Sequence, residues 1–285
     1  MAVQILTDST GYLDEELKRE LNIRVVSLCL SFGEDSMREL DIDNDSFFEM
    51  MAQKGIPVSS QPSVAELYDE MSSVVGNGDD LCCIFLSSEM SGTYVTAQLV
   101  KNMVLEKYEQ AKIEIIDSRS SGMQMGYAAV AAAKAAKEGK NLEQVKEAAL
   151  ENMRRSRFLF IPDSLEYLKK GGRVSEIGAL LGDIFKIIPI ITVVDGKMTV
   201  LKKVRTKKNA ILAMTDKMFQ DIKEFSFGEA VVLHINCLNE AKELAKAINE
   251  KLKETIKVMD IGPVIGLHVG PGAIGIVYYT LKAMR

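Results

Sequence analysis

The sequence predicts an α/β protein of two lobes, and three observations support this. A chain of 285 residues that is 47% hydrophobic and 26% charged is long enough to bury a full core and to form two lobes. Short apolar runs, partly β-branched, alternate with segments that carry helix start and stop signals. A clear hairpin appears only late in the chain. We therefore expect a mostly parallel α/β first lobe at residues 1–155 and a mixed-sheet α/β second lobe at residues 156–285.

The first lobe contains short apolar runs that predict strands at Val3–Leu6, Arg24–Leu30, Leu81–Leu86 and Ile113–Ile116. Between them, Asp43 to Lys54 predicts a helix that stops at Gly55. Ser63 followed by Glu66 is a capping box for a helix that ends before Gly76. The Ala-rich stretch from Gly126 to Glu138, with an N-cap candidate at Asn141 after it, predicts a pair of helices that closes the lobe.

The second lobe begins with a predicted strand at Phe158–Ile161 and a short helix that Ser164 caps. Asp195-Gly196 suits a two-residue type I′ turn, so the runs on either side of it predict a hairpin. Its strands are expected at Ile187–Val194 and Met198–Val204. The remaining elements are a helix from about Thr206, strands at Ala230–Ile235, Ile256–Asp260 and Ala273–Thr280, and a helix at Asn239–Lys253.

Composition excludes several functional classes. The net charge is −5, and no stretch concentrates basic residues with aromatics, so we expect no nucleic-acid partner. The longest apolar runs reach about half of the roughly 18 residues that a membrane-spanning helix needs, and no basic region precedes the first strand. A cytoplasmic protein is therefore expected. The four cysteines have no metal-type spacing, so we expect buried free thiols, no metal and no cofactor.

Two serine-rich junctions are the most distinctive local feature. Residues 59–63 read Ser-Ser-Gln-Pro-Ser and residues 86–94 read Leu-Ser-Ser-Glu-Met-Ser-Gly-Thr-Tyr, each where an extended segment gives way to a helix. Hydroxyls at a helix start donate to an anion alongside free backbone N–H groups, and the helix dipole adds partial positive charge there. The junctions therefore predict a binding site for a small anion.

Other polar residues suggest weaker hypotheses. His268 precedes a Gly-Pro-Gly turn that would hold its ring at a strand end, whereas His234 lies in an apolar alternation and is given no function. Residues 270–275 match the letters of a dinucleotide fingerprint, but a strand is expected after them in place of the required helix. Asp8 and Asp117 end strands, which suits a site at the carboxyl edge of a sheet, but we favour an interpretation as helix caps.

The chain resembles the DegV family of fatty-acid-binding proteins, which includes the carrier subunit of bacterial fatty acid kinase. The similarity covers nearly the whole chain, and the joint order and spacing of its motifs are specific. The motifs are Thr7-Asp8-Ser9, Ser60-Gln61-Pro62-Ser63, Leu86-Ser87-Ser88, Ser91-Gly92-Thr93-Tyr94, Asp117-Ser118, residues 165–173, Lys203-Val204-Arg205 and His268-Val269-Gly270-Pro271-Gly272.

This resemblance implies a two-lobed protein that holds one long-chain fatty acid, such as palmitate or oleate, between its lobes. Its carboxylate contacts fall on Ser59 and Ser91, with His268 as a third contact and Ser60 and Thr93 beside them. The family often has Thr where this chain has Ser59, so the hydroxyl donor is kept. Arg173 and Arg205 correspond to positions thought to face the kinase, although an interpretation as solvated or carbonyl-capping charges stays open.

Three functional hypotheses follow from these residues. The first is a monomeric lipid carrier that has no catalysis of its own and presents the carboxylate to a separate ATP-binding kinase subunit. The second is a serine-based acyl hydrolase. It is weakened because the sequence has no Gly-x-Ser-x-Gly elbow and no His-Glu-x-x-His zinc helix, and only His268 could serve as a general base for Ser59 or Ser91. The third is a regulatory protein whose bound lipid reports metabolic state. We favour the carrier, with lipid transport or fatty acid metabolism as its role.

Overall fold

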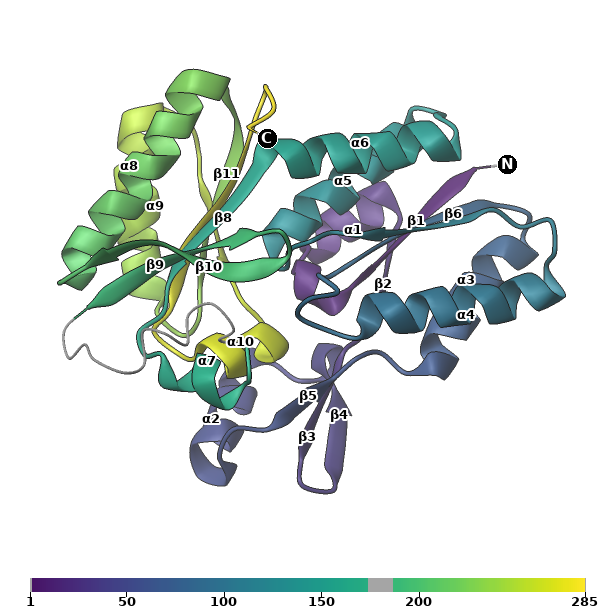
Figure 1. Ribbon diagram of the computed structural model, residues 1–285, viewed down its shortest axis with the longest axis horizontal. Helices are drawn as coiled ribbons and strands as arrows, with labels where there is room; N and C mark the ends of the chain where they lie inside the picture. The colour runs from purple at the N-terminus through teal and green to yellow at the C-terminus, as the bar shows by residue number, and fades with distance from the viewer. Residues whose placement is uncertain (1, 174–186, 285) are drawn as a thin grey trace. The chain divides into compact units, whose positions relative to one another are not determined.

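The computed structural model describes residues 2–173 and 187–284, and the chain divides into two compact units (Figure 1). The first unit is formed by Met1–Ile42 and Val58–Met153, and the second by Asp43–Pro57 and Arg154–Arg285. Helix α2 (Asn44–Lys54) thus belongs to the second unit. The sequence predicts a single lobe boundary between residues 155 and 156, which stays a prediction. It does not anticipate that residues 43–57 belong to the second unit.

A parallel sheet forms the centre of the first unit, as predicted. Its strand order is β2-β1-β6-β7, with β1 at Val3–Asp8, β2 at Ile23–Val26, β6 at Asp80–Phe85 and β7 at Ile113–Asp117. The run of residues 81–85 in β6 is continuously apolar and buried, because helices cover parallel sheets on both faces. The helices of this unit are α1 (Glu15–Leu21), α3 (Val64–Gly76), α4 (Thr93–Lys107), α5 (Met123–Lys137) and α6 (Leu142–Arg155), whose last two residues lie in the second unit.

Helices α3 and α4 pack side by side on this sheet. Their buried side chains, among them Leu67, Met71 and Val100, form one core with Leu6 and Phe85 of the strands. Fully burying an aliphatic side chain of this size contributes about 1.5–3 kcal/mol relative to leaving it exposed. The core therefore fixes where α4 begins relative to the carboxyl ends of the strands.

The expected strand Arg24–Leu30 is wrong as a single element. It divides into β2, in the parallel sheet, and β3 (Cys29–Phe32), in a small antiparallel sheet of order β4-β3-β5. The other strands of that sheet are β4 (Asp35–Arg38) and β5 (Val58–Ser60). The break lies at Leu28, whose backbone N–H donates to Ser9 Oγ at 3.0 Å. A side chain thus takes the backbone group that strand pairing would otherwise use.

A mixed sheet forms the centre of the second unit, again as predicted. Its order is β10-β9-β8-β13-β11-β12, with only the β11–β12 pair parallel. The Asp195-Gly196 turn has φ values of 48° and 83°, as a type I′ hairpin requires. The strands are β8 (Ser156–Ile161), β9 (Ile188–Val194), β10 (Lys197–Val204), β11 (Phe227–His234), β12 (Lys257–Asp260) and β13 (Ile274–Thr280).

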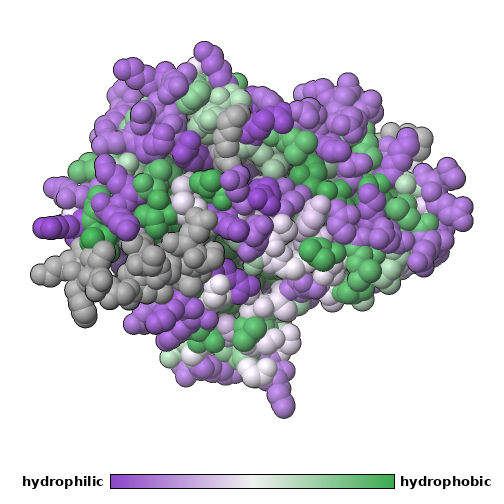
Figure 2. All heavy atoms as spheres, viewed as in Figure 1, coloured by the Kyte–Doolittle hydropathy of each residue, from purple (hydrophilic) through white to green (hydrophobic). Residues whose placement is uncertain are grey.

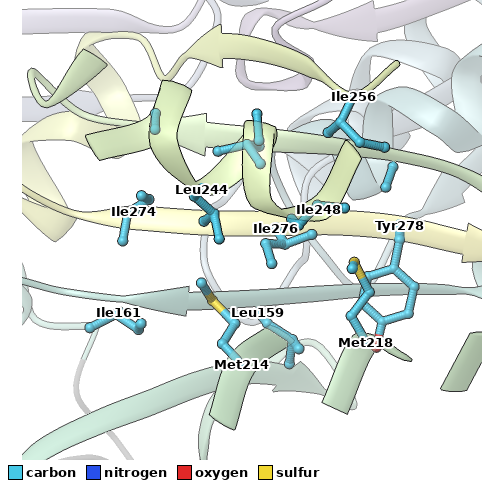
Figure 3. Close-up of a cluster of buried hydrophobic side chains, with 14 of the residues drawn as sticks. Leu159, Ile161, Met214, Met218, Leu244, Ile248, Ile256, Ile274, Ile276 and Tyr278 are labelled. Atoms are coloured by element: carbon cyan, nitrogen blue, oxygen red, sulfur yellow. The ribbon is translucent and has the colours of Figure 1, made fainter. Parts of the chain in front are cut away.

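Helices α8 (Lys207–Phe225) and α9 (Leu238–Leu252) cover this sheet. Figure 3 shows Met214 and Met218 of α8 gathered with Leu159 and Tyr278 of the strands in a fully buried cluster. The buried Tyr278 hydroxyl donates to Asp221 at 2.6 Å, so its polar atom is satisfied inside the core. Two short helices, α7 (Glu166–Lys170) and α10 (Pro263–Val269), complete the unit and pack against each other.

The sequence predicts that the cysteines are free thiols and that no apolar run is long enough to span a membrane. All four cysteines are free, as predicted, but only Cys82 and Cys83 are fully buried. Burial raises the pKa of Cys82 to about 12, so this thiol stays protonated and behaves as a small apolar group. Across residues 2–173 and 187–284, no helix combines the length and the apolar character needed to cross a membrane.

Candidate functional site

Asp8 supports the carboxyl edge of the parallel sheet. It ends β1, and its Oδ2 atom accepts the backbone N–H of Leu86 at 2.8 Å. Its Oδ1 atom accepts the N–H of Thr10 at 3.0 Å, which caps the 3-10 helix Ser9–Gly11 as predicted. Burial raises the pKa of Asp8 to about 6, although the hydrogen bonds from Thr10 and Leu86 oppose the shift. Asp8 therefore positions the start of the loop after β6.

Asp117 supports the same loop from β7. Its carboxylate accepts the backbone N–H of Ser88 at 3.2 Å, the Ser88 hydroxyl at 2.5 Å and the Arg119 N–H at 2.9 Å. Its interpretation as a helix cap is wrong, because α5 begins at Met123 with Gly122 as its N-cap. The carboxylate instead ties the second residue of the Ser87–Ser91 turn to the neighbouring strand.

Ser91 and Thr93 place two hydroxyls at the N-terminus of α4. The Met90 and Ser91 N–H groups both donate to the Ser87 carbonyl, at 2.9 and 3.0 Å, and close the turn. Ser91 Oγ lies 2.9 Å from Thr93 Oγ1 and accepts the Thr93 N–H at 3.3 Å. Thr93 is fully buried, whereas Ser91 is partly exposed. Of these two hydroxyls, that of Ser91 is therefore the more exposed, and Thr93 contacts it from the buried side.

Ser59 and Ser60 lie on the last two residues of β5. This strand pairs with β3 so that Ser59 lies opposite Leu30 and Ser60 opposite Cys29. Successive side chains of a strand point to opposite faces, and Ser59 is half-buried whereas Ser60 is exposed. The two hydroxyls therefore face different surroundings. Ser63, three residues further on, accepts the Glu66 N–H at 3.0 Å and caps α3 as the capping box predicts.

Gln61 brings the two serine-rich junctions together, and sequence reasoning missed it. Its Nε2 atom donates to Thr96 Oγ1 in the first turn of α4 at 2.5 Å. Its Oε1 atom occupies the space into which a Cβ at Gly92 would project. A glutamine within the first junction carries no sequence signal for such a link beyond its own reach and hydrogen-bonding capacity.

His268 does not lie at a strand end, so that expectation is wrong. Pro263 begins α10, because N–H groups in the first turn of a helix have no intrahelical partner and proline lacks only that group. His268 occupies the last turn of this helix. Its Nδ1 atom packs against Gly171, where an added Cβ would overlap the ring. Burial, together with the Arg173 charge, lowers the pKa of His268 to about 4. The imidazole is therefore neutral at pH 7.

Arg173 and Arg205 differ from each other in their environment. Arg173 donates from its guanidinium to the Gly171 carbonyl at 2.6 Å, and burial lowers its pKa. It is thus a carbonyl-capping group next to His268, one of the interpretations that the sequence left open. Arg205 is exposed and lies between β10 and Thr206, the N-cap of α8. Of the two, Arg205 is the exposed one, as is typical of a partner-facing charge.

The glycine-rich turn after α10 is not a nucleotide loop. Gly270 and Gly272 have φ values of 87° and 83°, and the strand β13 follows them, as predicted. Lys207 Nζ donates to the Gly272 carbonyl at 3.3 Å and fixes the turn. His234 is a buried strand residue, as predicted, with its Nδ1 atom 3.0 Å from Asp260 Oδ1.

Comparisons with known proteins agree with this architecture. Residues 2–281 match the family model described as "Uncharacterised protein, DegV family". A DegV domain-containing protein of Clostridium acetobutylicum is 57% identical over 285 residues, which is 100% of both chains. The crystal structure of DegV, a fatty acid binding protein from Bacillus subtilis, is 30% identical with a TM-score of 0.88, covering 98% of this chain and 99% of that one.

A second solved structure is similar over the same range. The stearic acid-binding protein from Eubacterium ventriosum is 26% identical to this chain with a TM-score of 0.89, and 98% of each chain is covered. Its fold therefore extends across both the parallel and the mixed sheet described above.

Proposed function

Because this chain belongs to the DegV family, we propose that it binds one long-chain fatty acid, such as palmitate or oleate. The observation that carries the proposal is the pair of hydroxyls at the N-terminus of α4, linked through Gln61 to the junction that carries Ser59. The fatty-acid-binding DegV protein of Bacillus subtilis and the stearic acid-binding protein of Eubacterium ventriosum support the ligand class.

The chemistry of the first-unit site suits a carboxylate head group. Ser91 is partly exposed, and its hydroxyl is oriented by Thr93, so it can donate to an anion without any change of protonation. A hydrogen bond to a charged group contributes about 1.5–3 kcal/mol, and the dipole at the start of α4 adds roughly 0.3–1 kcal/mol. Ser59 is proposed as a second donor, and Ser60 stays a weaker candidate because it points to the other face of β5.

His268, in the last turn of α10, stays proposed as a ligand contact. A neutral imidazole, as the lowered pKa of His268 implies, offers one N–H donor and one acceptor nitrogen. It is a poor general base at pH 7, because the protonated form that a base must reach is disfavoured by burial and by the Arg173 charge. This feature favours binding over serine-based hydrolysis.

We propose further that the chain presents the carboxylate to a separate ATP-binding kinase subunit and is not a catalyst by itself. Neutral hydroxyls can donate hydrogen bonds both to a carboxylate and to the more highly charged acyl phosphate that a kinase would make. An exposed apolar stripe on α4, the helix that follows Ser91, supports a protein partner. Val95, Leu99 and Met103 recur every four residues along α4 and are 63%, 57% and 39% exposed. Figure 2 shows hydrophobic side chains gathered over α4.

The acyl tail supplies the other part of the binding energy. Each buried CH₂ of a ligand contributes about 0.8 kcal/mol, so a long tail outweighs the head-group contacts. The chain is rich in Leu, Ile and Val and contains 15 Met, whose flexible thioethers suit a cavity that accepts several tails.

Native mass spectrometry of the purified protein, followed by lipid extraction, tests the proposal. We expect a monomer with one long-chain fatty acid per chain, and stoichiometric uptake of oleate after delipidation. Adding ATP and the kinase subunit from the same organism should then yield acyl phosphate, trapped as the hydroxamate. Repeated preparations without bound acid, combined with no saturable uptake of palmitate or oleate, would overturn the proposal. Hydrolysis of an activated ester with a burst would favour the hydrolase.

A further inference from the structure

A single side chain connects the two segments that carry the candidate head-group hydroxyls. Gln61 directly follows Ser60 at the end of β5, and its amide donates to Thr96 in the first turn of α4 at 2.5 Å. Thr96 is anchored in turn, because its backbone N–H donates to the Gly92 carbonyl at 2.9 Å. The link therefore ends on the same turn of helix that presents Ser91 and Thr93.

Gly92 leaves room for this link. The Gln61 Oε1 atom lies where a Cβ at Gly92 would be, so any side chain at position 92 would displace the amide. Gly92 itself has φ −74° and ψ −4°, values that every residue adopts, so its backbone conformation does not require glycine. What the glycine provides here is space for the Gln61 amide against the start of α4.

We propose that Gln61 is a positioning residue, which sets the spacing between Ser59 and Ser91 and thereby the preference of the site for a carboxylate head group. This inference rests on the proposed function. A head-group site tolerates errors of only about 0.5 Å in the placement of its donors, so the residues that lock those donors matter as much as the donors themselves. Pro62, the next residue, has a fixed φ and restricts the backbone on the other side of Gln61.

Loss of the Gln61–Thr96 hydrogen bond should affect ligand binding differently from loss of an ordinary packing contact. Loss of a packing contact would weaken every ligand and lower the stability of the first unit together. Loss of a positioning contact should weaken the ligands whose head group needs two well-placed donors, and it should spare a ligand of the same tail that needs only one. Oleate and oleyl alcohol are such a pair, because they share the tail and differ in the charge and the number of acceptor atoms of the head group.

Thr96 gives a closely matched pair of variants. Thr96→Val removes the hydroxyl that accepts the Gln61 amide while keeping the branched shape, and Thr96→Ser keeps the hydroxyl. In delipidated full-length protein we expect Thr96→Val to weaken oleate about fivefold to tenfold, which corresponds to the roughly 1 kcal/mol of one hydrogen bond. Oleyl alcohol should change less than about twofold, and Thr96→Ser should match the wild type. Gln98→Ala, on the same helix, is the control.

Gly92 supplies a second, independent test. Gly92→Ala should displace the Gln61 amide and weaken oleate binding in the wild-type background. It should cost little stability, because the obstructing atom is the end of a flexible side chain. The same substitution in a Gln61→Ala background meets no amide and should have no further effect. This double-mutant cycle measures the coupling directly.

The results separate the inference from the proposed function. If Ser91→Ala weakens oleate binding but Thr96→Val and Thr96→Ser bind oleate with equal affinity, only the role of Gln61 is overturned. Equal losses for oleate and oleyl alcohol in Thr96→Val, together with a lower Tm, would also overturn it by making the link merely structural. If Ser91→Ala leaves oleate affinity unchanged, the head-group site itself is wrong and the inference falls with it.

Discussion

Ser91 Oγ lies 2.9 Å from Thr93 Oγ1 and accepts the Thr93 backbone N–H at 3.3 Å. When the Thr93 hydroxyl and N–H both donate to Ser91, the Ser91 proton is left to point at a ligand. The half-exposed serine is thus oriented by a buried threonine at the positive end of a helix.

We predict that Ser91→Ala weakens oleate by about 1.5–3 kcal/mol, which is at least tenfold, because one neutral donor to a charged acceptor is lost. Binding should remain measurable, since the transfer energy of the tail is unchanged. The measurement is titration of delipidated protein with oleate, alongside thermal unfolding of the lipid-free variant. Wild-type affinity with a lowered Tm would identify Ser91 as a helix cap only.

Ser59 and its neighbour Ser60 offer a matched comparison. The two residues point to opposite faces of β5, so we predict that Ser59→Ala weakens oleate and that Ser60→Ala changes affinity less than about twofold. Ser59→Ala combined with Ser91→Ala should bind more weakly than either single variant. The two losses need not add, because both donors serve one acceptor and a water can enter the gap. A larger loss in Ser60→Ala would reverse the assignment.

Arg205 and Arg173 should behave differently in a kinase assay. Arg205→Ala removes an exposed charge, so we predict wild-type oleate affinity and a slower encounter with the kinase subunit, seen as a raised KM for the carrier. Arg173→Ala also removes the donor to the Gly171 carbonyl beside His268. It should therefore lower stability as well as phosphorylation. Equal loss of oleate binding in both variants would assign them to the pocket or to the fold.

His268 and Asp8 predict opposite pH dependences of stability. The pKa of His268 is about 4 in the folded protein, below its ordinary value of 6.5, so the unfolded state binds more protons in this window. Its contribution should destabilise the protein by about 1–2 kcal/mol as the pH falls from 7 to 5. The pKa of Asp8 is raised to about 6 from 3.8, so its contribution should stabilise the protein by about 1 kcal/mol over the same interval.

Denaturant unfolding at pH 5 and pH 7 separates these two contributions. The loss of stability on acidification should be smaller in His268→Asn than in the wild type, because the neutral amide does not titrate. It should be larger in Asp8→Asn, which removes the opposing gain. The same pH difference in all three proteins would contradict both assignments.

The sequence predicts the sheets better than it predicts the site. Apolar runs such as Leu81–Leu86 and the Asp195-Gly196 turn carry their structure locally, because burial and φ > 0 select those residue types. The break between β2 and β3 depends on Ser9, which lies 19 residues before Leu28 in the chain, so no local pattern indicates it. Helix α10 is missed because its Pro and Gly residues are typical of turns.

The serine junctions are predicted as anion-binding elements, but their relation to each other is not. Their proximity depends on Gln61 reaching Thr96 across 35 residues of chain, and on the space that Gly92 leaves. A long-range contact between two polar side chains has no periodicity, and it can be seen only once the fold has placed both segments.

The most direct test of the head-group assignment is the ¹³C spectrum of [1-¹³C]oleate bound to the delipidated protein, recorded as a function of pH. Hydroxyl donors and a helix N-terminus favour the charged form, so we predict that the bound carboxyl keeps the chemical shift of a carboxylate to a lower pH than free oleate does. In the variant with both Ser59→Ala and Ser91→Ala, the bound resonance should move and titrate at a higher pH. An identical resonance and titration in the wild type and this double variant would contradict the assignment.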